Sequence, residues 1–294
     1  MKVLDFGSLN YDYVYHVDHA VTPGETLDSS SLETFFGGKG LNQAISLARA
    51  GAEVFLAGQI GEEGASFIDL CKKSGVRADY VKTIPGKSGH AIIQLDKNAQ
   101  NCILLYGGAN RKQTRDNIDA VLSHFEKGDI LLLQNEINEL DYIIDKAYER
   151  GLQIALNPSP FDDALKACDL KKISIFLLNE IEGGQISGET QPEKILDVMT
   201  AKYPEARIVL TLGSDGVIYR DKNETHKQGI FKVKAVDTTA AGDTFTGYFL
   251  ASLCRNIPIK EALTLCAKAS AITVSRMGAT DSIPTLKEVE SASL

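Results

Sequence analysis

The chain has 294 residues, and its 31 Lys and Arg against 39 Asp and Glu give a formal net charge of −8. Hydrophobic residues make up 44% and charged residues 24%, the proportions of an ordinary globular protein, which excludes a disordered, collagen-like or coiled-coil chain. Without a cluster of five or more Lys and Arg, this acidic chain is not expected to bind nucleic acid or an anionic membrane. The length predicts one large domain or two ordinary ones.

Cysteine usage and the N-terminal residues point to a cytoplasmic protein. The five cysteines are widely spaced and include no C-x-x-C pair, a pattern that indicates neither a disulfide framework nor a zinc site. Residues 1–7 lack the apolar stretch of a signal peptide, and no apolar run approaches the roughly 18 residues of a membrane span. We therefore expect the protein in the reducing cytoplasm.

Short β-branched runs alternate with amphipathic stretches along most of the chain. The pattern predicts strands at residues 54–57, 130–133, 153–156, 173–178 and 208–211, and helices at 65–74, 140–150, 244–253 and 259–276. Strands and helices that alternate at this spacing are typical of βαβ units around a mostly parallel sheet. Residues 130–133 are apolar throughout, which predicts a strand covered on both faces. We therefore expect an α/β fold.

Two segments break this alternation. Residues 11–18 and 90–106 read as strands without helices between them, and we expect them to form a small β-sheet that projects from the main domain. No linker rich in Pro, Gly or Ser divides the sequence, and it contains no internal repeat. The sequence therefore favours one α/β domain over residues 1–294.

Familiar nucleotide-binding motifs do not occur in the sequence. Gly86-Lys87-Ser88 resembles the end of a phosphate-binding P-loop, but Val81 stands where that motif needs Gly. Residues 58–64 have the wrong glycine spacing for a dinucleotide fingerprint, which argues against a nicotinamide-dependent oxidoreductase.

A run of small residues at 236–247 leads into a predicted helix. Where such a helix begins, free backbone NH groups and the positive helix end converge with no side-chain bulk, a geometry that holds a phosphate. Asp243 in the first turn is within reach of a hydroxyl that approaches this phosphate, so it can act as a base. Asp237 and Asp243 can equally be capping residues of an ordinary helix. This segment alone does not favour either the phosphate site or the capped helix.

A second glycine-rich entry to a helix lies at residues 35–44, with the sequence Phe-Phe-Gly-Gly-Lys-Gly-Leu-Asn-Gln-Ala. Its glycines allow a ligand to approach the backbone, and the polar side chains of Lys39, Asn42 and Gln43 exceed what a turn requires. A tight turn before a packed helix also explains this segment when it is taken alone.

These two runs indicate a particular protein family much more specifically when they are taken together with several other segments than either run does alone. The others are Asn10 and Asp12 after the first strand, and residues 23–26 (Pro-Gly-Glu-Thr), 107–110 (Gly-Gly-Ala-Asn), 157–160 (Asn-Pro-Ser-Pro) and 179–182 (Asn-Glu-Ile-Glu). In this order, from residue 4 to about residue 284, the chain resembles the ribokinase family of carbohydrate kinases. The resemblance implies a ribokinase-like fold, in which helices flank a central mostly parallel β-sheet and a small β-sheet, here residues 11–34 and 88–106, is a lid.

The resemblance also implies the residues that act on ATP. In that family the Asp of Ala-Ala-Gly-Asp is the catalytic base, which assigns this role to Asp243. The backbone NH groups of Ala240, Ala241, Gly242 and Asp243 are then expected to form the anion hole. By the same resemblance Asn179 and Glu182 organise Mg²⁺ and the phosphates of ATP. The remaining nucleotide-binding residues are expected to be Thr211, Gly213, Ser214, Gly216 and, in the adenine pocket, Lys268.

Sugar and cation sites follow from the resemblance in the same way. The sugar is expected to contact Asn10, Asp12, Gly38, Lys39, Asn42, Glu136 and Asp243. A potassium ion is expected, mostly through carbonyl groups, at Asp237, Thr239, Thr273, Arg276, Gly278 and Ser282. Because two lids pack together in ribokinases, the resemblance also implies a homodimer that forms through the lid.

The expected function is ATP-dependent transfer of a phosphoryl group to the primary hydroxyl of D-ribose. Kinases of fructose, deoxyribose, adenosine or pseudouridine are alternatives within the class. A sugar-binding regulator that has lost catalysis is an alternative outside it, but the presence of Asp243 and Glu182 argues against such a loss. Tyr11, Tyr13 and Tyr15 alternate along one lid strand, and a packed β-face is the preferred interpretation over stacking on a nucleoside base.

Overall fold

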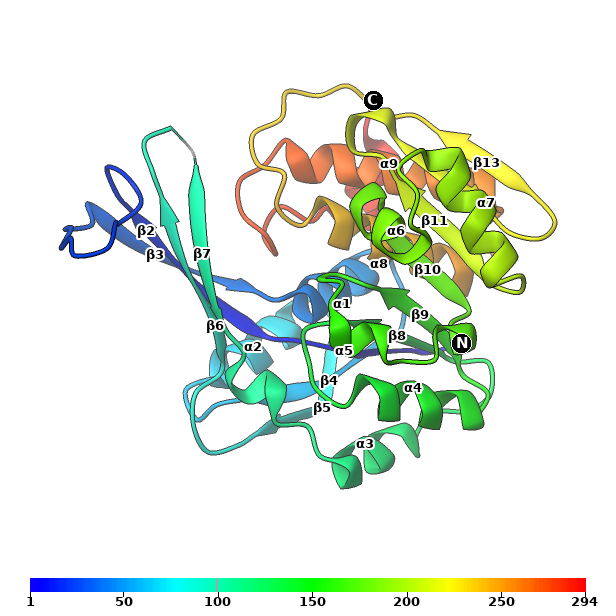
Figure 1. Ribbon diagram of the computed structural model, residues 1–294, viewed down its shortest axis with the longest axis horizontal. Helices are drawn as coiled ribbons and strands as arrows, with labels where there is room; N and C mark the ends of the chain where they lie inside the picture. Colours follow the sequence, from blue (N-terminus) through cyan, green and yellow to red (C-terminus); the bar gives the residue numbers. More distant parts are fainter. Residues whose placement is uncertain (99) are drawn as a thin grey trace.

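The computed structural model describes residues 1–98 and 100–294. Within this part of the chain, nine strands form the main sheet in the order β13-β12-β11-β10-β9-β8-β1-β4-β5 (Figure 1). Neighbours pair in parallel from β11 to β5, and β12 and β13 extend the sheet antiparallel. Their bounds are β1 (Val3–Phe6), β4 (Val54–Ile60), β5 (Arg77–Thr83), β8 (Ile130–Gln134), β9 (Gln153–Asn157), β10 (Ile175–Asn179), β11 (Arg207–Thr211), β12 (Val217–Arg220) and β13 (Thr225–Gln228). The predicted mostly parallel sheet is confirmed.

Helices cover both faces of this sheet. One face packs against α3 (Arg115–Leu122), α4 (Leu140–Glu149), α5 (Asp163–Lys166), α6 (Glu180–Ser187) and α7 (Pro192–Lys202). The other packs against α1 (Lys39–Arg49), α2 (Ala65–Lys73), α8 (Ala241–Cys254), α9 (Ile259–Val274) and α10 (Leu286–Ser291). On β8, Leu131 and Leu133 belong to the first hydrophobic core and Ile130 and Leu132 to the second. This strand is therefore apolar throughout because both of its faces are buried.

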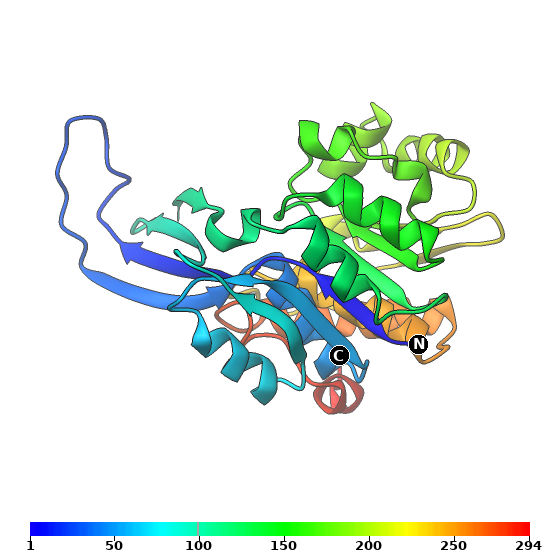
Figure 2. The ribbon, with the colours of Figure 1, turned by 90° about the horizontal axis from the view of Figure 1, so that it is seen from below.

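A smaller sheet projects from the main one, as Figure 1 shows. Its strand order is β3-β2-β6-β7, with β2 (Asn10–His16), β3 (Ser31–Gly37), β6 (Gly89–Leu95) and β7 (Asn101–Tyr106). The strands predicted within residues 11–18 and 90–106 are confirmed, and β3 is a further strand that was not expected from the sequence. Figure 2 shows that the connection between β2 and β3 reaches furthest from the main sheet.

Two of the three tyrosines of β2, Tyr11 and Tyr13, pack within the protein at the root of the smaller sheet. Tyr11 is buried, its ring centroid lies 4.4 Å from that of Phe67, and its hydroxyl lies 2.6 Å from Ser66 Oγ. Tyr13 stacks on Tyr11 with the ring centroids 6.2 Å apart. These contacts favour the packed β-face over stacking on a ligand.

Parallel strands end at the same edge of the main sheet, so the loops that follow them meet there. The segments after β1, β8, β9, β10 and β11 all lie at this edge, and α1 and α8 begin beside it (Figure 1). Most of the predicted site residues belong to these segments. Among the helices of the described residues, none is long and apolar enough to cross a membrane.

Candidate active site

The segment predicted to hold a phosphate forms the start of α8. Ala240 has a left-handed backbone with φ of 60°, and Thr244 donates the first hydrogen bond of the helix to Ala240 O at 2.8 Å. The NH groups of Ala241, Gly242 and Asp243 therefore precede the first intrahelical bond. A Cβ added to Gly242 would meet no described atom within 4 Å, so this turn faces open space. A helix start with this geometry can bind an anion.

Asp243 is almost completely buried, and both of its carboxylate oxygens accept hydrogen bonds from side-chain amides. Asn42 Nδ2 donates to Oδ2 at 3.0 Å, and Gln43 Nε2 donates to Oδ1 at 2.8 Å. Both amides come from the first five residues of α1. The two glycine-rich helix entries identified in the sequence therefore meet at the carboxylate predicted to be the base.

Close packing of α1 on α8 makes this meeting geometrically feasible. A Cβ on Gly247 would overlap Ser46 Oγ, so only glycine allows the two helices to approach so closely here. Ser46 Oγ donates to Thr244 O at 2.9 Å and joins the two helices directly beside the base. Gly247 thus allows α1 to place the two amides against Asp243.

A polar cavity of about 240 Å³ opens over the start of α8. Lys39 lines it together with Asp243 and Glu182. Burial alone lowers the pKa of Lys39, but the charges of Asp243, Glu136 and Glu182 raise it above its usual value. Lys39 is therefore a cation that faces three carboxylates, well placed to neutralise phosphate charge.

Asn179 and Glu182 lie across this cavity at the end of β10. They form a capping box for α6: Asn179 Oδ1 accepts from the backbone NH of Glu182 at 2.9 Å, and Glu182 Oε2 accepts from the backbone NH of Asn179 at 3.0 Å. Asn157, at the end of β9, also lines the cavity, and its Oδ1 is buried with no hydrogen-bond partner in the described residues. These oxygens are of the type that Mg²⁺ and its bound waters prefer.

The fit to Mg²⁺ depends on the phosphates as well as on the protein. Within residues 1–98 and 100–294, no group of three or more His, Cys, Asp or Glu side chains is arranged to hold a metal ion. Mg²⁺ commonly binds through one or two carboxylates together with substrate phosphates and water, so Glu182 facing a phosphate site meets that requirement.

A larger, apolar cavity of about 630 Å³ adjoins the polar one. The two share Thr211, Thr238, Ala241, Gly242 and Phe245. Gly213, Ser214 and Gly216, predicted as a nucleotide loop, line the larger cavity together with Ile230, Phe231 and Val233. A flat aromatic base fits an apolar cavity of this kind, with its phosphates directed towards α8. The contribution of residues 230–233 was missed because they carry no motif.

Lys268 does not line this cavity, in contrast to the adenine-pocket position expected for it. Its Nζ lies 5.7 Å from the ring centroid of Phe231 and donates to Ala292 O at 3.4 Å. Ala267 and Ala271 of the same helix line the cavity instead. Successive helical residues point about 100° apart, so a shift of one position along α9 separates the cavity wall from the outer side.

Residues predicted to bind the sugar gather where the small sheet joins the main one. A third cavity, of about 220 Å³, is lined by Asn10, Leu105, Gly107, Asn110, Arg111 and Glu136. Asn10 Oδ1 accepts a hydrogen bond from Asn110 Nδ2 at 2.7 Å. Leu105, Asn110 and Arg111 were not predicted as sugar contacts, although Asn110 belongs to a segment that carried the family resemblance.

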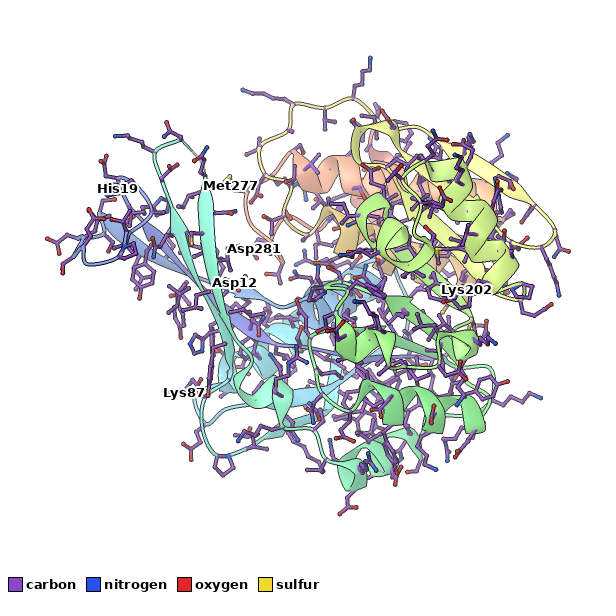
Figure 3. All side chains as sticks on the ribbon, in the orientation of Figure 1. Asp12, His19, Lys87, Lys202, Met277 and Asp281 are labelled. Carbon is purple, nitrogen blue, oxygen red and sulfur yellow. The ribbon has the colours of Figure 1, made fainter. Side chains whose placement is uncertain are left out.

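Two carboxyl groups, of Asp12 and Glu136, and the turn at Gly38 lie beside this third cavity. Burial and the charge of Glu136 raise the pKa of Asp12 to about 7. Glu136 accepts a hydrogen bond from the backbone NH of Lys39 at 3.0 Å and another from Ser8 Oγ. Gly38 has a φ of 93°, which favours glycine at the turn into α1. Figure 3 labels Asp12 at the root of the small sheet.

The residues predicted to bind potassium form a connected group only in part. Asp237 joins two loops, because its Oδ1 accepts from the NH of Thr239 at 2.9 Å and its Oδ2 accepts from the NH of Gly278 at 3.0 Å. Burial raises the pKa of Asp237, but these hydrogen bonds outweigh it and lower the pKa below its usual value. The side chains of the other three have partners elsewhere: Thr273 Oγ1 lies 3.0 Å from Thr244 Oγ1, Arg276 Nη2 donates to Glu288 Oε1 at 2.7 Å, and Ser282 Oγ donates to Ala279 O at 2.7 Å.

Comparison with known proteins agrees with this geometry. The model of the pfkB family of carbohydrate kinases matches residues 2–286. The ribokinase of Schizosaccharomyces pombe is 33% identical over 99% of this chain and 97% of its own, and that of Staphylococcus aureus is 35% identical over 98% of each. The deoxyribokinase of Salmonella typhimurium is 26% identical over 98% of this chain and 97% of its own.

Solved structures of ribokinases have the same fold as this chain. Ribokinase from Cryptococcus neoformans in complex with ADP superimposes with a TM-score of 0.86 and 31% identity, over 98% of each chain. Ribokinase from Arabidopsis thaliana in complex with ribose and ATP also gives a TM-score of 0.86, with 28% identity over 98% of this chain and 97% of that one. The predicted ribokinase-like fold and carbohydrate kinase class are confirmed, and the chain belongs to the pfkB family of carbohydrate kinases.

Proposed function

We propose that this protein is an ATP-dependent kinase that converts D-ribose and ATP to D-ribose 5-phosphate and ADP. One observation supports the proposal most directly: Asp243, held by Asn42 and Gln43, lies at the start of α8, where the NH groups of Gly242 and Asp243 precede the first intrahelical hydrogen bond. The ribokinases of similar sequence, and the structures of ribokinases with ADP or with ribose and ATP, support ribose as the acceptor and ATP as the donor.

The mechanism follows from the positions of these groups. Adenine binds in the apolar cavity, and the triphosphate extends over the polar one to the NH groups of Gly242 and Asp243. The primary hydroxyl oxygen of the sugar attacks the γ-phosphorus, the bond from that phosphorus to the β-phosphate oxygen breaks, and Asp243 accepts the hydroxyl proton. Negative charge that spreads over the phosphoryl oxygens is stabilised by the helix start and by Lys39.

Mg²⁺ belongs to the proposed function and is expected near Glu182 and Asn179. When bound with ATP, the ion neutralises charge on the phosphate oxygens. The chain itself contributes the carboxylate of Glu182, held in one rotamer by the capping box with Asn179.

We also propose that the small sheet, within residues 11–34 and 88–106 of a single domain, closes over the sugar and excludes water from the phosphoryl group. The free cysteines of the described residues support the cytoplasm as the location.

Potassium activation is a further part of the proposal, because Asp237 ties residue 278 to the loop that enters α8. Asp237→Ala is expected to lower kcat in K⁺ about ten- to hundredfold, because the NH groups of the anion hole lose their fixed position. The measurement is kcat with increasing KCl, at constant ionic strength. Asp221→Ala is the matched control, since Asp221 also holds two turn NH groups, of Asn223 and Glu224, away from the site. Equal activity of Asp237→Ala and the wild-type protein at all KCl concentrations would contradict this role.

The proposed homodimer explains the exposed apolar side chains of β7. Ile103, Leu104, Leu105 and Tyr106 are each more than half exposed, and Leu104 is 68% exposed. Leu104→Lys is expected to convert a dimer to a monomer, because a lysine cannot be buried unpaired in an apolar contact. Light scattering after size-exclusion chromatography measures the mass. Tyr148→Lys changes a residue of α4 that is also more than half exposed, and it should leave the dimer intact. A monomeric wild-type protein at micromolar concentration would show that the dimer proposal is wrong.

The decisive experiment is ADP release in a coupled assay with ribose, deoxyribose, fructose, adenosine or pseudouridine as the acceptor, with and without K⁺. Ribose is expected to give the highest kcat/KM. If another acceptor gave a higher kcat/KM, the protein would still be a kinase, but its substrate would be that acceptor instead of ribose. If folded protein released no ADP with any of them, the protein would instead be a sugar-binding regulator.

A further inference from the structure

Four buried side chains form a hydrogen-bonded chain from the first strand of the main sheet to the proposed base. Gln134 Nε2, at the end of β8, donates to Asp5 Oδ1 at 3.0 Å and also to Gln43 Oε1 at 2.7 Å. Gln43 Nε2 then donates to Asp243 Oδ1 at 2.8 Å. All four residues are buried, and they come from β1, β8, α1 and α8, which pack together at the centre of the molecule (Figure 1).

Asp5 is an unusual residue for its place in the fold. It lies on β1 between Leu56 of β4 and Leu132 of β8, two leucines of the second hydrophobic core. Its Oδ2 has no hydrogen-bond partner in the described part of the chain. Burial raises the pKa of Asp5 well above its usual range despite the hydrogen bond from Gln134, and the charge of Asp243 raises it further. A carboxyl group buried in this way destabilises the fold, and a valine would fill the same space without that cost.

Asp5 holds the first amide of this chain in place through a second hydrogen bond. Both hydrogens of Gln134 Nε2 are used, one on Asp5 and one on Gln43. Asp5 and Asp243 accept hydrogen bonds at the two ends of the chain, so the NH₂ group of Gln134 faces the carbonyl oxygen of Gln43. The NH₂ group of Gln43 must then face Asp243, where it donates. Without the acceptor at residue 5, the amide of Gln134 keeps only its hydrogen bond to Gln43 Oε1, so the positions of Gln134 and of Gln43 are fixed less firmly.

We propose that Asp5 is a positioning residue for phosphoryl transfer, which acts through Gln134 and Gln43 to hold the carboxylate of Asp243 in the orientation that accepts the hydroxyl proton. Asn42 holds the second oxygen of that carboxylate at 3.0 Å, so the chain from Asp5 fixes its rotation. The proposal rests on the proposed function, because it assigns a role to Asp5 in that reaction.

Asp5→Val tests the proposal, because it keeps the size of the side chain and removes the acceptor. We expect kcat to fall at least about tenfold, with the KM values for sugar and ATP within about twofold of wild type and with an equal or higher midpoint of thermal unfolding. Asp5→Asn keeps an acceptor oxygen and should retain kcat within about threefold. Leu132→Val shortens the neighbouring side chain in the same layer and is the control for lost packing; it should leave kcat unchanged.

A double-variant comparison shows whether Asp5 acts through the amides. Gln43→Leu alone should lower kcat, and adding Asp5→Val to it should change kcat by less than about twofold, because the chain is already cut. If Asp5→Val does not fold, Gln134→Leu cuts the chain at its middle and should give the same loss of kcat. Full kcat in folded Asp5→Val or Gln134→Leu, or losses that multiply in the double variant, would overturn the proposal.

The proposed function and this inference can fail separately. Each variant is measured with whichever sugar the wild-type protein phosphorylates best. A wild-type protein that releases no ADP with any sugar would overturn both. An active wild-type protein with an unaffected Asp5→Val would overturn this inference alone.

Discussion

Asp243→Asn is expected to lower kcat at least about a hundredfold while the protein folds and binds sugar with little change. A general base contributes about 10²- to 10⁴-fold to the rate, which corresponds to about 3–5 kcal/mol of barrier height. The asparagine keeps one acceptor oxygen for Asn42 or Gln43, but its amide cannot take the hydroxyl proton. The loss should therefore appear in kcat and leave the KM for the sugar nearly constant.

The measurement is steady-state ADP release with varied sugar, together with sugar binding by calorimetry. Asp141→Asn is the matched control, because Asp141 lies in the first turn of α4 just as Asp243 lies in the first turn of α8. The control should keep full activity. A folded Asp243→Asn protein with near-normal kcat would show that the proton is taken by another group.

The sequence predicted most of the fold because the main sheet is buried on both faces. Strands such as residues 130–133 must be apolar throughout, and such a continuous apolar run is easily recognised in a sequence. β3 was missed because most of Ser31–Gly37 is exposed and mixes polar with apolar residues. It is a strand through its pairing with β2, from Asn10 opposite Gly37 to His16 opposite Ser31. Such pairing depends on the tertiary structure rather than on a local pattern.

The candidate site divides in a similar way. Asp243, Asn42 and Glu136 carry chemical groups that the sequence displays next to glycines or at the end of a strand. The hydrogen bond of Gln43 to Asp243 joins residues 200 positions apart, so only the packing of α1 on α8 reveals it. The walls of the apolar cavity carry no motif, because any apolar side chain of suitable size serves there.

Asp12→Ala is expected to raise the KM for the sugar about a hundredfold or more, with a much smaller change in kcat. Hydrogen bonds to a charged group contribute about 1.5–3 kcal/mol each, and two sugar hydroxyls bound to one carboxylate account for this loss. Steady-state kinetics with varied ribose measures the effect. Asp18→Ala removes an exposed carboxylate from the same small sheet's β2–β3 connection, where it pairs with Lys97, and should leave the KM unchanged.

The pH dependence provides an independent test of this role. Burial and the charge of Glu136 raise the pKa of Asp12 from 3.8 to about 7. The folded protein therefore binds more protons than the unfolded chain between about pH 4 and pH 7, and this group lowers the free energy of unfolding as the pH rises through that range. A sugar that donates hydroxyls to Asp12 requires the ionised form, so the KM should rise about tenfold for each pH unit below 7 and become constant above it.

Asp12→Asn should remove both effects, because its amide does not titrate. Its KM for ribose is expected to be high but constant from pH 5.5 to pH 8, and its thermal unfolding should lose the part of the pH dependence that comes from Asp12. A wild-type KM that is constant over the same range would mean either that the neutral acid binds the sugar equally well or that Asp12 does not contact it. The Asp12→Ala variant separates these, since only a residue in contact with the sugar raises the KM when it is removed.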